Sequence, residues 1–265
     1  MNSSFVWFLG ANVKPKTLLK LLKAFPQEEV LGQQGVFEGK VFDIADIAKH
    51  GGSCVKKIKR VCCSSEAYMD RAVFLRLPCI EYLSVENVSV RDSWLEGVLA
   101  AHGMGIKELR LRGCLLLTDW SLENICRHCV SLQVLDVSRT SFSARVLRLV
   151  TEMPQKETLV ELEIVGCYML MLGATVFWAG ENKSLKKISV DSEQIREIKE
   201  LEKMVEYFSC LETCEVAGVS YTLFGDDVSQ LRLKTNTEIR CETKLKNGSS
   251  EGVMEYFSSL ALGGN

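Results

Sequence analysis

Two cysteines and a histidine lie close together in the middle of the chain. Cys126 and Cys129 are separated by two residues, and His128 lies between them. A structural zinc site needs four ligands, which usually come from two paired motifs. The sequence contains no second Cys-x-x-Cys, since Cys62 and Cys63 are adjacent. We therefore expect no metal and no cofactor, and interpret Cys126 and Cys129 as buried structural cysteines.

The sequence also offers little for catalysis. Its three histidines, His50, His102 and His128, lie in separate segments, and no cysteine or serine is singled out as their partner. The sequence lacks a phosphate-binding loop, a Gly-x-Ser-x-Gly elbow and a His-Glu-x-x-His zinc motif. We expect a protein that is not an enzyme.

A six-residue pattern, apolar-x-x-apolar-x-apolar, organises the chain. It occurs six times, at steps of 26, 26, 27, 26 and 26 residues. A period of this length with this pattern is typical of a leucine-rich repeat, in which a strand is followed by a returning helix. The expected fold is an α/β leucine-rich-repeat solenoid, a horseshoe with a parallel concave sheet and outer helices. The six copies begin at Ile80, Ile106, Leu132, Leu159, Leu185 and Leu211.

Side chains near each repeat support this interpretation. Cys114 and Cys167 each follow the first anchor of their repeat by eight residues. Leucine-rich repeats favour Asn or Cys there, because the side chain bonds the backbone of the turn that leaves the strand. Thr118 is expected to cap the helix of its repeat, ahead of Trp120.

The pattern divides the chain into three parts. Residues 80–221 hold the six repeats, and residues 1–79 are expected to form an N-terminal cap or a degenerate docking segment. Residues 222–265 are expected to form a C-terminal cap, with residues 231–233 and 239–241 as the arms of a hairpin. The apolar stretch 169–179 is expected to be buried on more than one side or to contact a protein partner.

Composition limits the partners and the compartment. The formal net charge is -2 and the pI is about 6.0, so we expect neither direct nucleic-acid binding nor attraction to membranes. No stretch approaches the ~18 apolar residues of a membrane span, and no signal peptide is recognisable. The eleven cysteines are odd in number and are interpreted as reduced thiols. We expect a cytoplasmic or nuclear protein.

Strand residues between the apolar anchors form the candidate binding surface, because side chains alternate along a strand. Lys107, Arg110 and Arg112 are expected to form a basic patch beside an acidic patch of Asp136, Glu161 and Glu163. Mixed charge of this kind is ordinary solvation in many proteins, but on a solenoid it also gives partner specificity. The predicted protein-binding residues of the concave face are Tyr82, Glu86, Lys107, Arg110, Arg112, Asp136, Arg139, Glu161, Glu163, Lys187 and Asp191.

Residues 109–138 carry a closer likeness, with Cys114, the pair Thr118-Asp119, and Cys126 and Cys129 in sequence. This segment resembles the cysteine-containing class of leucine-rich repeat. That class typifies the F-box-and-leucine-rich-repeat substrate receptors of ubiquitin ligases and their F-box-less relatives. The resemblance implies a non-catalytic protein-binding scaffold, acting as substrate receptor or regulator in a ubiquitin-ligase-type complex. The alternative is a constitutive leucine-rich-repeat subunit of a larger assembly.

Two short segments bear on how such a receptor would join a ligase. Residues 15–22 echo the opening of an F-box, which docks the Skp1 adaptor of a cullin ligase, but a capping helix explains them more simply. Ser121, Leu122, Cys126 and Val130 fit a helix motif that binds elongin C, although the repeat itself explains their spacing. We expect a protein partner on the concave face, and a Skp1/cullin-type adaptor on the N-terminal segment remains an open alternative.

Overall fold

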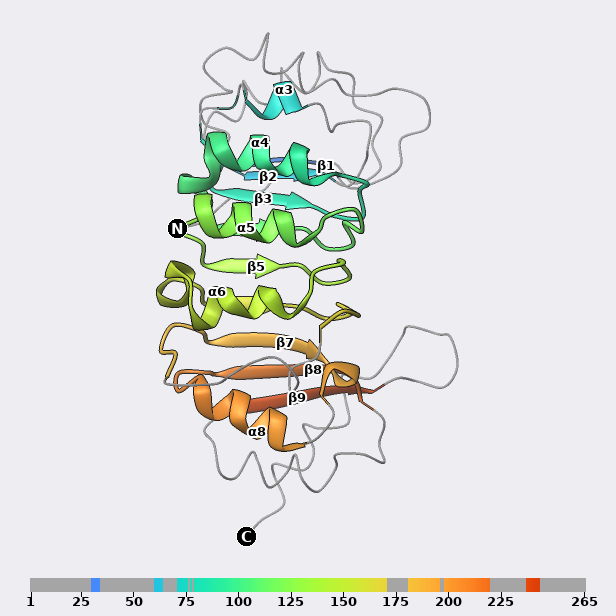
Figure 1. Cartoon of the computed structure of the whole chain (residues 1–265), viewed down its shortest axis with the longest axis vertical. Helices are drawn as coiled ribbons and strands as arrows, with labels where there is room; N and C mark the ends of the chain where they lie inside the picture. Colours follow the sequence, from blue (N-terminus) through green and yellow to red (C-terminus); the bar gives the residue numbers. More distant parts are fainter. Residues whose placement is uncertain are drawn as a thin grey trace.

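The computed structural model describes residues 30–33, 60–63, 71–75, 77, 79–170, 181–195, 198–219 and 237–243. Within these residues, parallel strands form one nine-stranded sheet whose order follows the chain. Figure 1 shows the strands stacked along the long axis of the molecule. The strands are β1 (Val30–Gln33), β2 (Arg60–Cys63), β3 (Tyr82–Val85), β4 (Glu108–Arg110), β5 (Val134–Asp136), β6 (Glu161–Glu163), β7 (Lys187–Asp191), β8 (Thr213–Val219) and β9 (Glu238–Thr243).

The helices return the chain from the end of one strand to the start of the next. Figure 1 shows the larger ones side by side on one face of the sheet. An α/β architecture with a parallel sheet is therefore confirmed, while the horseshoe curvature stays a prediction. The helices are α3 (Arg71–Phe74), α4 (Asp92–His102), η3 (Gly103–Gly105), α5 (Asp119–His128), η4 (Ala144–Leu147), α6 (Arg148–Thr151), η5 (Pro154–Glu157), η6 (Ser192–Gln194) and α8 (Ile198–Tyr207).

The middle apolar residue of each repeat lies in the core and pairs with its equivalents on the neighbouring strands. None of these side chains is exposed to solvent. The sequence repeat thus sets the register in which neighbouring strands pair, because a shift of one residue would turn every anchor to the other face of the sheet. The anchors are Leu83, Leu109, Leu135, Leu162, Ile188 and Cys214.

Local sequence accounts for the second repeat's helix. Thr118 is the N-cap of α5, and its hydroxyl accepts a hydrogen bond from Trp120 N at 3.3 Å, as predicted. Asp119 then places a carboxylate in the first turn, which favours the positive end of the helix dipole. Leu122 and Ile125 are buried on the face toward the sheet.

The strand ladder continues beyond residues 80–221 at both ends. β1 and β2 precede β3, and Val61 of β2 pairs with Leu83. Ile58, Val61 and Cys63 also follow the apolar-x-x-apolar-x-apolar pattern, 22 residues before Ile80.

At the other end, β9 pairs in parallel with β8, so residues 239–241 extend the ladder. The expected hairpin stays a prediction, because its other arm at 231–233 lies outside the described residues. The F-box-like segment 15–22 and most of the apolar stretch 169–179 also lie outside them.

Candidate protein-binding surface

The strand residues that flank the buried anchors form one surface, which we call the strand face. Their side chains point away from the helices because alternate residues of a strand lie on opposite faces. The register aligns them in two columns across the sheet. In the described central strands they are Tyr82, Ser84, Glu108, Arg110, Val134, Asp136, Glu161, Glu163, Lys187, Ser189, Thr213 and Glu215.

One arginine spans two strands of this face. Arg110 Nη1 on β4 lies 3.1 Å from Glu163 Oε1 on β6, with Asp136 of β5 between them in register. Burial raises the pKa of Glu163 above its ordinary value, and the Asp136 charge adds to this effect, while Arg110 opposes both. Asp136 is almost fully buried, and its Oδ1 accepts a hydrogen bond from Ser138 N at 2.9 Å. Arg110 therefore lies within the acidic group instead of in a separate basic patch.

A lysine performs the same bridging on the next strands. Lys187 Nζ on β7 lies 3.0 Å from Glu161 Oε1 and 3.2 Å from Glu215 Oε2, which flank it on β6 and β8. Burial lowers the pKa of Lys187, but the two carboxylates outweigh burial, so the pKa lies above its ordinary value. Glu215 also lies 3.8 Å from Arg240 on β9.

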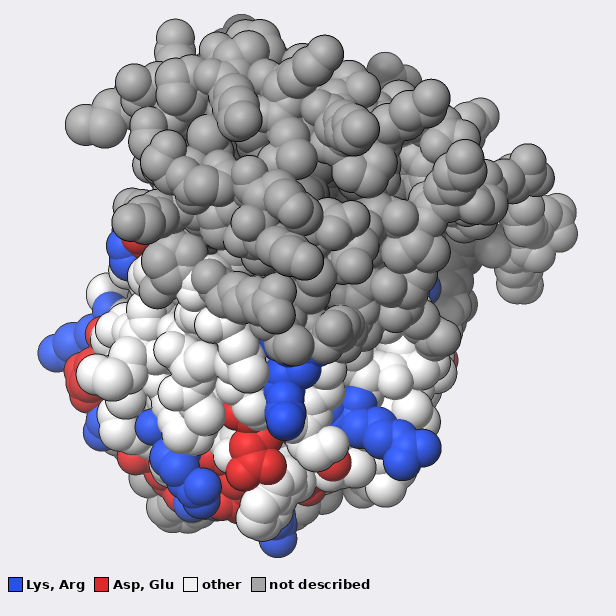
Figure 2. Space-filling model, turned by 90° about the horizontal axis from the view of Figure 1, so that it is seen from above, with Lys and Arg blue, Asp and Glu red and all other residues white. Residues whose placement is uncertain are grey.

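The centre of the strand face thus carries more acidic than basic side chains. Asp136 and Glu163 share Arg110, and Glu161 and Glu215 share Lys187. Apart from the almost fully buried Asp136, these side chains keep partial solvent exposure, from 16% for Glu163 to 32% for Lys187 and Glu215. Seen from the end of the sheet that carries β1, Figure 2 shows basic and acidic side chains interspersed on the part of the surface that is described.

Other predicted residues lie at the strand entrances or beside β3. Lys107 precedes β4, and its Nζ lies 2.9 Å from Glu81 Oε2, away from Arg110's partner. Tyr82 is half-buried on β3, and Glu86 follows that strand and accepts a hydrogen bond from Ser84 Oγ at 2.9 Å. Lys107 and Arg110 thus pair with different carboxylates, Glu81 and Glu163.

The remaining predicted residues lie where the strands end. Arg112 follows β4, and Asp191 ends β7, where its Oδ1 accepts a hydrogen bond from Glu193 N at 3.1 Å. Arg139 has a left-handed backbone with φ of 56°. Its equivalents in the neighbouring repeats are Gly113 and Gly166, both with φ of 71°. The sequence-based placement of Arg139 on the strand face is thus corrected to the turn that leaves β5.

Buried cysteines hold these turns in place. Cys114 Sγ donates to the carbonyl of Val85 at 3.2 Å, and Cys167 Sγ donates to the carbonyl of Val137 at 3.1 Å. Each bond joins a repeat to the preceding one, so the predicted turn-bonding role is confirmed. Burial raises the pKa of Cys114 to about 11 and that of Cys129 to about 12. At neutral pH both thiols stay protonated, which disfavours metal binding and nucleophilic attack.

The described parts of the chain place no three His, Cys, Asp or Glu side chains close enough to hold a metal ion. Two of the four residues of the elongin-type motif lie inside the fold, while Cys126 is half-buried and Val130 is exposed. Ser121 and Leu122 are buried, and Ser121 Oγ donates to Asp92 Oδ1. In this fold these side chains are not available to a partner.

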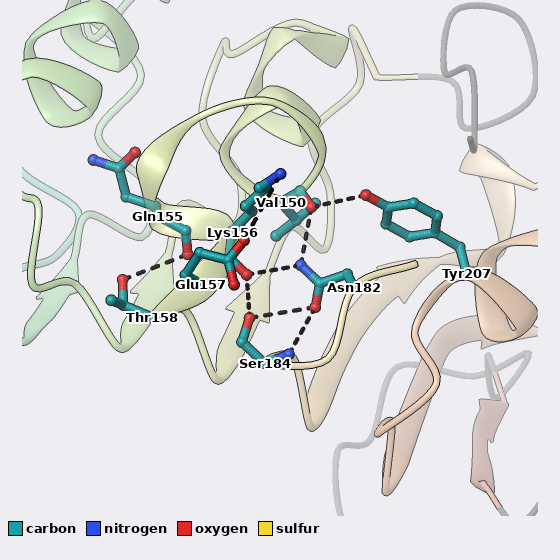
Figure 3. Close-up of polar contacts among 8 residues, drawn as sticks. All are labelled: Val150, Gln155, Lys156, Glu157, Thr158, Asn182, Ser184 and Tyr207. Atoms are coloured by element: carbon teal, nitrogen blue, oxygen red, sulfur yellow. Dashed lines mark hydrogen bonds and ion pairs between the residues drawn. The ribbon is translucent and has the colours of Figure 1, made fainter. Parts of the chain in front are cut away.

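Sequence reasoning missed a column of buried amides that joins successive repeats. Gln155 Nε2 donates to the carbonyls of Cys126 at 2.9 Å and Cys129 at 3.2 Å. One repeat later, Asn182 Nδ2 donates to the carbonyls of Val150 and Lys156, both at 3.0 Å, and Figure 3 shows these contacts. The amides satisfy carbonyls that helix ends leave without partners. The available signal was the 27-residue step from Gln155 to Asn182, which is a repeat step.

Successive parallel strands, register-matched buried anchors and returning helices define an α/β fold of the leucine-rich-repeat type. Among solved structures, a chain from the crystal structure of the Rad7 and Elc1 complex in yeast is similar, with a TM-score of 0.56 and 14% identity. The likeness covers 86% of this chain and 64% of that one, so this chain spans less than two thirds of its neighbour's length. At this identity the likeness supports the fold alone. No protein-family model matches the chain.

Among the helices of the described segments, none combines the length and the apolar character that crossing a bilayer requires.

Proposed function

We propose that this protein is a non-catalytic protein-binding scaffold, which acts as a substrate receptor or regulator in a ubiquitin-ligase-type complex. The observation that carries the binding role is the strand face, where Arg110 and Lys187 each bridge carboxylates of neighbouring strands. These pairs fix the side chains in a rigid, partly exposed array. A preorganised array loses little side-chain entropy when a protein docks on it.

The ligase role rests on sequence resemblance and receives loose support from the fold. The similar yeast chain belongs to a complex of two proteins, which agrees with a fold used for protein–protein contact. We propose that the chain works in the cytoplasm or nucleus. A Skp1/cullin-type adaptor would bind the N-terminal segment, and the selected protein would bind the strand face, which we expect to be concave.

A constitutive subunit of a larger assembly is the second candidate. It is favoured by large apolar side chains that stay exposed at the strand exits, of which Tyr168 at 79% and Met169 at 69% are the most exposed. Permanent interfaces bury more apolar surface than transient ones.

Affinity purification of the full chain from cells, followed by mass spectrometry, separates these functions. A receptor should retain Skp1 and a cullin together with substoichiometric substrates. A constitutive subunit should retain a fixed set of proteins in equal amounts without cullin components. Recovery of the chain alone would contradict both proposals.

A further inference from the structure

The loops that follow β4, β5 and β6 form a second surface, which we call the exit rim. In Figure 1 it lies on the side toward which the strand arrows point. We infer that the exit rim docks a segment of a partner protein that carries apolar side chains flanked by carboxylates. The inference rests on the proposed protein-binding role but assigns a surface separate from the strand face. The rim residues are Arg112, Leu115, Leu116, Trp120, Arg139, Tyr168 and Met169.

The exit rim is continuous because its loops are bonded to one another. Ser141 Oγ of the third repeat donates to the carbonyl of Leu115 at 3.0 Å. Arg139 N donates to the carbonyl of Val165 at 2.8 Å, which joins the third repeat to the fourth. Strands in a parallel sheet lie about 4.8 Å apart, so Leu115 and Tyr168, two repeats apart, are separated by roughly 10 Å at the backbone.

A four-residue motif sets the apolar character of the rim. It occurs as Cys114 to Leu117 and as Cys167 to Leu170. In both copies the outer two residues are buried, and the inner two are exposed apolar residues. The exposed fractions are 64% for Leu115, 48% for Leu116, 79% for Tyr168 and 69% for Met169.

An apolar side chain is not present at this part of the loop in every repeat. The equivalent position of the third repeat is Ser141, which is exposed. Trp120 adds a further large side chain at the start of α5, with 54% of it exposed. Most of the large exposed apolar residues of the described chain therefore gather on one rim, and patches of this kind mark protein contact sites.

The charges of the rim indicate the partner's chemistry. Arg112 and Arg139 flank the apolar residues, and neither lies within ion-pair distance of an acidic side chain among the described residues. In contrast, Arg110 on the strand face is already paired. Unpaired guanidinium groups attract carboxylates, often through two parallel hydrogen bonds.

Two acidic features limit the extent of this basic surface. Asp119 lies near Trp120, but its carboxylate accepts hydrogen bonds from Ser143 N and Oγ and lies 3.9 Å from Arg145 Nε. Asp191 ends β7, and Glu193 follows it. The acidic partner segment should therefore lie over the exits of β4 to β6 and stop short of β7.

Selection of random peptides displayed on phage against the full chain tests this inference. Enriched peptides should combine Leu, Phe or Trp with Asp or Glu. Their affinity, measured by fluorescence polarisation, should fall about tenfold or more in Arg112→Glu/Arg139→Glu and in Leu116→Ser/Tyr168→Ser. These side chains are partly or largely exposed, so the variants should fold, and far-ultraviolet circular dichroism checks this.

Matched controls make the test specific. Leu75→Ser removes an exposed apolar side chain away from the rim, and Arg127→Glu reverses an exposed charge in the last turn of α5. Both should bind the peptides normally. Reversal of the strand-face pair, Arg110→Glu/Glu163→Arg, should also leave peptide binding unchanged.

Several results would overturn the rim inference. Enriched basic peptides, no enrichment, or affinities unaffected by both rim variants would each do so. Loss of peptide binding only in the strand-face reversal would place the peptide site there, so the proposed function would stand while the rim inference fell.

Discussion

Arg110 on β4 reaches past β5 and places its Nη1 3.1 Å from Oε1 of Glu163 on β6. The two residues are 53 positions apart in sequence, which is two repeats. Their pairing therefore depends on the stacking of three successive strands. Because Asp136 lies between them, the arginine balances two carboxylates at once, the almost fully buried Asp136 and the partly exposed Glu163.

Removal of this arginine should destabilise the fold. Arg110→Met keeps much of the side-chain volume but leaves Asp136 and Glu163 without their shared cation. We expect a loss of about 1–2 kcal/mol in the free energy of unfolding, measured with urea at neutral pH. In Arg110→Met/Glu163→Gln, most of this loss should return. If the double variant is as unstable as the single one, electrostatic repulsion is not the cause.

The free energy of unfolding should depend on pH through the carboxylate of Asp92. Partial burial raises the pKa of Asp92, but hydrogen bonds from Ser121 and Thr118 outweigh burial, so the pKa lies below its ordinary value. The folded state therefore favours the carboxylate, and this stability is present above the unfolded pKa and is lost as pH falls through the lower folded pKa.

The change Asp92→Asn should cost about 1–2 kcal/mol at pH 7, allowing for partial solvent exposure. Its cost should shrink when urea unfolding is repeated at pH values below the ordinary pKa of aspartate, 3.8. A cost that is independent of pH would contradict the ionic origin of these bonds.

At the left-handed turn positions, a substitution to glycine should stabilise the fold and a substitution from glycine to alanine should destabilise it. At Arg139, with φ of 56°, Arg139→Gly should raise stability by about 0.5–1 kcal/mol because glycine adopts this backbone without strain. At Gly166, a Cβ would add the left-handed cost and would lie 3.1 Å from Arg139 Cγ. Gly166→Ala should therefore cost about 1–2 kcal/mol. Thermal unfolding of both variants beside the wild type provides the measurement, and a more stable Gly166→Ala would contradict the account.

The buried amide side chains should contribute as much to the free energy of unfolding as an apolar core side chain does. Gln155 is fully buried, and its Nε2 donates to carbonyls of the preceding repeat. Gln155→Leu leaves those carbonyls without a donor and should cost about 2–4 kcal/mol in urea unfolding. Gln133→Leu, at an exposed position, serves as the control and should change stability little. Equal stability of both variants would show that water replaces the amide.

The sequence was sufficient for the ladder and its core, because the anchors represented by Leu109 and Leu135 recur at a nearly constant step. It also located the Thr118 cap and the Cys114 bond, which depend on neighbours within one repeat or the next. The 25-residue spacing of Val55 and Ile58 from Ile80 and Leu83 suggests a degraded repeat here, but β2 instead pairs Val61 with Leu83, 22 residues away.

The surface was harder to predict because exposure depends on how successive loops stack. Leu115 and Leu116 look like core residues in sequence, and only the packed loop shows that Cys114 and Leu117 fill the interior instead. Likewise, Arg110 and Glu163 were assigned to different patches because their contact crosses an intervening strand.

The most direct test of the central claim is quantitative affinity purification of the full chain beside the reversed pair Arg110→Glu/Glu163→Arg. The reversal keeps the two opposite charges together but exchanges their places on the strand face. The control is Lys203→Glu, which reverses a charge on the exposed surface of α8. If the strand face binds the partner, the reversed pair should retain at least tenfold less of it, while the control retains the wild-type amount. Recovery of equal amounts of the partner with the wild type, the reversed pair and the control, all three of them folded, would contradict binding through the strand face.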